Sequence, residues 1–118
     1  MEKILIVNND PDTLLLLQDL LQLKGYKVML NTVKEQVPAM IANFQPDLVL
    51  LDITRQEVMD EIKKQAGKDS IPVLLMTGHN SYPGNKENGF KYFIKKPFVL
   101  DELLKKIESI LNIRVITE

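Results

Sequence analysis

One carboxylate in this chain has a position suited to chemistry. Asp52 ends the stretch 46–52, Pro-Asp-Leu-Val-Leu-Leu-Asp, in which four consecutive aliphatic residues precede the charge. Such a run predicts a strand buried on both faces, as in the centre of a parallel sheet. Because open α/β sheets bind ligands beyond the carboxyl ends of their strands, Asp52 is predicted to be the working residue. The local signals leave open that Asp52 only begins a turn or caps the next helix.

The elements that must position Asp52 alternate along the chain. Apolar runs predict strands at residues 3–7, 26–30, 48–52, 71–77 and 92–94. Helical spacing predicts helices at 11–24, 37–44, 57–66 and around 103–111, whereas 79–89 is predicted to be a loop with at most one helical turn. This alternation predicts an α/β fold, a doubly wound five-stranded parallel sheet of order 2-1-3-4-5. At one end of that sheet, Asp52 then meets other polar residues: Asn8, Asn9, Asp10, Thr77 and Lys96.

The first helix has clear end signals and a broad apolar surface. Asp10 is predicted to be its N-cap and Pro11 its first residue, and Gly25 is expected just past its end. The same rule predicts that Gly67 closes the third helix. The first helix is predicted to pack on the sheet and against a neighbour through seven leucines: Leu14, Leu17 and Leu21, with Leu15, Leu16, Leu20 and Leu23 widening the stripe.

Composition restricts the class of protein. The chain has 118 residues, a formal net charge of −1 and no cysteine, which is typical of one cysteine-free globular domain. Its charge balance predicts neither nucleic-acid nor membrane binding, and no apolar run approaches a membrane span or a signal peptide. We therefore expect a cytoplasmic protein with one domain at 1–112. The tail 113–118 is left open as a continued helix, an added strand or a linker.

Four motifs together resemble the receiver domain of bacterial two-component response regulators, the CheY-like fold. They are residues 4–7 followed by the polar residues 8–10 (Asn-Asn-Asp) and Pro11, residues 46–52, Met-Thr-Gly at 76–78 and Phe-Ile-Lys-Lys-Pro-Phe at 93–98. The resemblance implies that Asp52 accepts a phosphoryl group from a histidine kinase or a phosphotransfer protein. It implies that Thr77 hydrogen-bonds this group, that Lys96 pairs with it, that Phe93 is the switch aromatic and that Pro97 follows a cis peptide bond.

The chain departs from the family pattern at the metal site. The family has an acidic pair after the first strand, which holds Mg²⁺ together with the acceptor, and this chain has Asn8 and Asn9. An amide brings no charge, so the remaining set of Asp10, Asp52 and Thr54 predicts a weakened Mg²⁺ site. If Asp10 caps the helix, its carboxylate points to backbone amides rather than to a metal. The fourth helix of the family is also predicted to be reduced here, and both departures are typical of a degenerate receiver.

Three functions follow from these residues. The first is a phospho-switch in which modification of Asp52 changes contacts with a downstream effector protein. The second is a pseudo-receiver, a phosphorylation-independent interaction module with the same fold. The third, a small phosphatase with Asp52 as nucleophile, is disfavoured because haloacid-dehalogenase-type enzymes have a second aspartate where Thr54 stands. The preferred prediction is a non-enzymatic receiver domain, and a homodimer is left open.

Overall fold

The computed structural model describes residues 2–8, 10–31, 36–52, 56–68, 70–77, 92–95 and 98–117, with the backbone alone for 56–59, 77 and 113–117. Several predictions fall elsewhere in the chain. The loop at 79–89 and the reduced fourth helix lie outside the described residues, as do Asn9, Thr54, Lys96 and Pro97.

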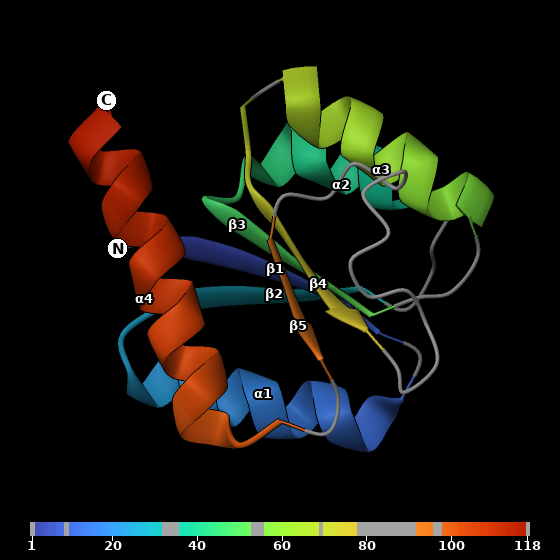
Figure 1. The fold of residues 1–118 in the computed structure, drawn as a ribbon. Coiled ribbons are helices and arrows are strands. Elements are labelled where there is room, and N and C mark those ends of the chain that lie inside the picture. Colours follow the sequence, from blue (N-terminus) through green and yellow to red (C-terminus); the bar gives the residue numbers. More distant parts are fainter. Residues whose placement is uncertain are drawn as a thin grey trace.

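The sheet has the predicted order. Its strands are β1 (Lys3–Asn8), β2 (Lys27–Asn31), β3 (Leu48–Asp52), β4 (Val73–Thr77) and β5 (Tyr92–Lys95). They form one sheet in the order β2-β1-β3-β4-β5, and every neighbouring pair is parallel (Figure 1). Because β1 and β3 are adjacent and parallel, their carboxyl ends meet at the same edge of the sheet.

Helices cover both faces of this sheet. They are α1 (Pro11–Leu23), α2 (Val37–Phe44), α3 (Gln56–Lys68) and α4 (Leu100–Thr117). Figure 1 shows α1 and α4 on one face and α2 and α3 on the other. None of the helices within the described ranges has the length and apolar character needed to cross a bilayer.

The central strand β3 contacts core side chains on both faces of the sheet, so its residues 48–51 are all aliphatic. Leu48 and Leu50 join the core cluster that contains side chains of α1 and α4, whereas Val49 and Leu51 join the cluster formed with α2 and α3. All four side chains are fully buried. Successive side chains of a strand point to opposite faces, so a sheet covered on both sides requires apolar residues at every position.

The end signals of α1 are confirmed. Asp10 is the N-cap and Pro11 the first helical residue. At the other end Gly25 has φ of 95°, and its N–H donates to the Gln22 carbonyl while the Tyr26 N–H donates to the Leu21 carbonyl. This pair of bonds is the Schellman arrangement, in which a glycine takes the left-handed position.

The prediction of a broad buried stripe on α1 is wrong, because the buried stripe is narrower. Leu14, Leu17 and Leu21 are buried, but Leu15, Leu16 and Leu23 are 55%, 56% and 84% exposed. A helix lying on a sheet and beside one other helix buries only part of its circumference, so leucines on the far side stay in solvent.

The end of the third helix and the start of the fourth strand also differ from the predictions. Gly67 lies inside α3, and the left-handed residue that ends this helix is Ser70, with φ of 56°. The Ile71 N–H donates to the Ala66 carbonyl, so serine here takes the place that glycine usually has. Strand β4 begins at Val73 rather than at residue 71, and the backbone of α4 continues through Thr117, so the tail up to that residue is helical.

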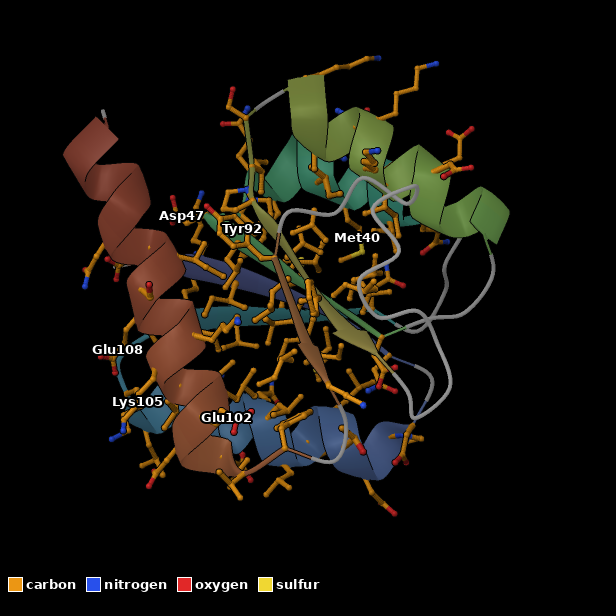
Figure 2. All side chains as sticks on the ribbon, viewed as in Figure 1. Met40, Asp47, Tyr92, Glu102, Lys105 and Glu108 are labelled. Atoms are coloured by element: carbon orange, nitrogen blue, oxygen red, sulfur yellow. The ribbon has the colours of Figure 1, made fainter. Side chains whose placement is uncertain are left out.

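Tyr26 connects the end of α1 to α4 and makes stability depend on pH. Burial raises the pKa of Tyr26 above its ordinary value of 10.0, and the negative charges of Glu108 and Glu2 raise this pKa further (Glu108 is labelled in Figure 2). A group whose pKa is raised by folding contributes stability that is present below its ordinary pKa and is lost as the pH rises past it.

We therefore expect the free energy of unfolding to decline above about pH 10, and to decline less steeply in Tyr26→Phe. Urea unfolding between pH 8 and pH 11 measures both slopes, and because lysines titrate in the same range, the difference between the two proteins isolates Tyr26. Parallel curves would contradict this assignment.

Candidate functional site at the carboxyl edge of the sheet

Asp52 and Asn8 lie side by side at the carboxyl ends of β3 and β1. The two residues are partners in the strand register, and the Asn8 Nδ2 donates a hydrogen bond of 3.0 Å to the Asp52 Oδ2. Asn8 is 4% exposed, whereas Asp52 is half-buried. The predicted meeting of these residues is confirmed, and one oxygen of the Asp52 carboxylate lies against the Asn8 amide.

The direction of the Asn8 amide is set by its second partner. Its Oδ1 accepts a hydrogen bond of 2.8 Å from the Asp10 N–H. The reversed amide would place its oxygen against the Asp52 carboxylate and its NH₂ against the Asp10 N–H, which would oppose two acceptors and two donors. Asn8 therefore presents only its donor group to Asp52.

Asp10 faces the first turn of α1. Its Oδ1 accepts from the Asp12 N–H at 3.2 Å, and its Oδ2 accepts from the Thr13 hydroxyl at 2.6 Å. The first is the bond of an N-cap, which satisfies a backbone donor that a helix leaves unpaired, and the second joins two side chains of the first turn. The expectation that a capping Asp10 turns its carboxylate toward the helix is confirmed.

The other predicted site residues are placed less completely. Thr77 ends β4, which pairs with β3, and is in register with Lys95, the last residue of β5. Lys96 follows Lys95 directly in the sequence. Phe93 lies on β5 and is 37% exposed, so its ring is only partly covered in this structure; its role as the switch aromatic stays a prediction.

A further buried asparagine lies at the same edge of the sheet. Asn31 ends β2, is 5% exposed and donates from Nδ2 to the Met40 Sδ of α2 (Met40 is labelled in Figure 2). Its register partner is Val7, so Asn31 lies on the far side of β1 from Asp52.

The arrangement of an aspartate at the end of β3, beside the end of β1, agrees with comparison to known proteins. Residues 4–108 match the family described as "Response regulator receiver domain". The chain belongs to this family. The sequence resemblance to a receiver domain of two-component signalling is thereby confirmed.

Named relatives and solved structures give the same result. The chain is 31% identical over 117 residues to the transcriptional regulatory protein CpxR of Klebsiella pneumoniae, covering 95% of this chain and 50% of CpxR. It is 29% identical to the response regulator MprA of a Mycobacterium species, again covering 50% of the relative. The chain thus spans about half the length of these curated relatives.

Among solved structures, the N-terminal domain of the nisin resistance regulator NsrR has a TM-score of 0.80 and 32% identity, covering 94% of this chain and 98% of that domain. The activated receiver domain of Klebsiella pneumoniae RstA has a TM-score of 0.81 and 27% identity, covering 92% of this chain and 97% of that one. Both are receiver domains of the fold predicted from sequence.

Receiver domains generally bind Mg²⁺ at the phosphorylation site, and the described residues around Asp52 fit that ion poorly. Mg²⁺ requires oxygen ligands and favours carboxylates, but the group that Asn8 turns toward Asp52 is an NH₂ donor. Asp10 uses its oxygens in the helix cap. Within the described ranges no group of three or more histidine, aspartate or glutamate side chains could hold a metal ion.

Sequence reasoning missed one role at this site. It interpreted Asn8 only as a weaker, uncharged replacement for a metal-binding acid, whereas in the structure this residue is a hydrogen-bond donor to Asp52. The signal was present in the residue type, because asparagine differs from aspartate both in charge and in carrying two N–H donors.

Proposed function

We propose that this receiver domain accepts a phosphoryl group on Asp52 and so switches its contacts with other proteins. An Asp52 carboxylate oxygen attacks the phosphorus of a phosphohistidine on a histidine kinase or a phosphotransfer protein. A P–O bond forms as the P–N bond breaks, and the histidine nitrogen keeps the electron pair and then takes a proton from solvent. The product is an aspartyl phosphate, as in other covalent phosphoryl transfers to carboxylates.

The observation that carries this proposal is the position of Asp52. It is a half-buried carboxylate at the carboxyl end of the central strand, held from one side by Asn8, in a chain that belongs to the receiver family. Transfer to a carboxylate depends mainly on positioning and on stabilisation of charge, and a carboxylate fixed at one oxygen has little freedom to lose before attack.

The remaining roles complete the proposal. Thr77 would donate its hydroxyl to the phosphoryl oxygens and Lys96 would offset their charge, with Phe93 responding to the change. The downstream effector would be a protein that distinguishes the two states of the domain, because added negative charge shifts a two-state equilibrium only if the states differ in their contacts. A cytoplasmic, non-enzymatic signalling role is part of the same proposal.

Intact mass after incubation with acetyl phosphate tests the acceptor. We expect a gain of one phosphoryl group in the unmodified protein and none in Asp52→Asn. This variant is a matched control because its amide oxygen still accepts from Asn8, so the fold at the strand end is preserved. Far-UV circular dichroism checks that both proteins are folded. No gain in folded protein, with or without Mg²⁺, would overturn the proposal and indicate a phosphorylation-independent module.

A further inference from the structure

Three residues at the site form one directed chain of hydrogen bonds. The Asp10 N–H donates to the Asn8 Oδ1, and the Asn8 Nδ2 donates to the Asp52 Oδ2. The first bond uses the backbone of the residue that caps α1, so the start of the helix fixes the orientation of the amide. Asn8 is almost completely buried, so its amide has little access to solvent.

The charge of the site differs from that of a site built around a divalent cation. In a cation site a second carboxylate stands close to the acceptor, and the two like charges are stable together because the metal lies between them. Here Asn8, the register partner of Asp52 on β1, is neutral and presents the positive end of its amide dipole. A hydrogen bond to an ionised acceptor is stronger than one between neutral groups.

We propose that Asn8 is a positioning residue that takes the place of the divalent cation at Asp52, so that this site works without bound Mg²⁺. The proposal rests on the proposed role of Asp52 as acceptor. The Asn8 Nδ2 holds the Asp52 Oδ2, and the Asn8 Oδ1 accepts from the Asp10 N–H, so Asn8 turns no oxygen toward a metal at Asp52. Asn8→Asp is therefore expected to create cation binding that the natural chain lacks.

Thermal unfolding in EDTA and in 10 mM MgCl₂ tests this. The melting temperature of the natural protein is expected to change by less than about 1 °C, because a ligand that does not bind the folded state does not stabilise it. Asn8→Asp is expected to melt lower than the natural protein in EDTA and to gain on the order of 3–6 °C in MgCl₂ if the cation is at about tenfold its Kd.

The double variant Asn8→Asp with Asp52→Asn is the matched control. It exchanges the carboxylate and the amide between the two strands, so its net charge and composition at this edge equal those of the natural chain. We expect no Mg²⁺-dependent shift in the double variant. A residue with a merely structural role would lower the melting temperature on substitution but would not create a response to Mg²⁺ that depends on Asp52.

Direct titration with Mn²⁺, followed by electron paramagnetic resonance of the free ion, keeps the test decisive if Asn8→Asp does not fold. The proposal expects no Mn²⁺ bound by the natural protein at millimolar concentration. Bound Mn²⁺ that is lost in Asp52→Asn would overturn it.

The phosphorylation assay in EDTA distinguishes the proposal that the site works without Mg²⁺ from the proposal that Asp52 is the phosphoryl acceptor. We expect the natural protein to gain the phosphoryl group in EDTA to within about twofold of the extent in MgCl₂. A requirement for Mg²⁺ of tenfold or more would overturn the cation-independent site and leave Asp52 as the acceptor. Absence of the gain in both buffers would overturn the acceptor role, and the Mg²⁺ and Mn²⁺ titrations would still decide how Asn8 acts.

Discussion

Leu50→Ala is expected to lower the free energy of unfolding by about 3–4 kcal/mol. Leu50 lies in the centre of β3, is fully buried and belongs to the core cluster formed with α1 and α4. Truncation there removes apolar contacts and leaves a cavity that a sheet paired on both sides of β3 cannot easily close. Since domains of this size are stable by only about 5–15 kcal/mol, the loss is a large share of the total.

Urea unfolding at 25 °C measures this loss, and the same substitution at an exposed leucine provides the control. Leu16 lies on α1 and is 56% exposed. Leu16→Ala is expected to change stability by no more than about 0.5 kcal/mol, because the side chain is largely in solvent and alanine favours helix. Similar losses in the two variants would contradict the placement of Leu50 in the core and of Leu16 outside it.

The contrast between these two leucines shows what the sequence could predict about the fold. The run at 48–51 could be assigned to a doubly covered strand because every position is apolar, and that pattern has few other structural explanations. The leucines of α1 could not be divided into buried and exposed ones, because seven leucines occupy both sides of a helix and only its neighbours decide which side is covered.

The glycines that predict where helices end were a similarly limited guide. Gly25 could be assigned because a glycine follows a helical pattern and a strand comes next, whereas Gly67 misled because Ser70 takes the left-handed position instead. Serine in that position is uncommon, and the bond from Ile71 to Ala66 that accompanies it is visible only in three dimensions.

The meeting of Asn8 and Asp52 was predictable from the sequence, whereas the direction of the Asn8 amide was not. The strand order brings Asn8 and Asp52 together, because parallel neighbours end at one edge of the sheet. The orientation of the Asn8 amide depends on the Asp10 N–H, a backbone group whose direction is set by the start of α1. A motif comparison records that an acid is missing at this position, but it does not show what the amide does there.

A second large effect is expected at the opposite end of β3, where Asp47 joins the amino ends of two strands. The Lys3 N–H donates to the Asp47 Oδ2 at 2.7 Å, and the Asp47 N–H donates to the Lys3 carbonyl at 2.7 Å. The Lys3 ammonium donates to the Phe44 carbonyl at 2.9 Å, so the same residue also anchors the end of α2 (Asp47 is labelled in Figure 2).

Asp47→Ala is expected to lower the free energy of unfolding by about 2 kcal/mol, because it removes an ionised acceptor and leaves the partly buried Lys3 N–H without this partner. Asp47→Asn keeps a carbonyl oxygen in the same place and is expected to lose no more than about 1 kcal/mol. Urea unfolding of the two variants separates the effect of the hydrogen-bond acceptor at residue 47 from that of its charge. Equal losses of stability would show that the charge rather than the hydrogen bond matters.

Because Asp47 and Asp52 are at opposite ends of β3, phosphorylation of either folded variant is expected to match that of the natural protein. A variant that is less stable but is still phosphorylated would show that the contacts between Asp47 and Lys3 support the sheet without affecting Asp52.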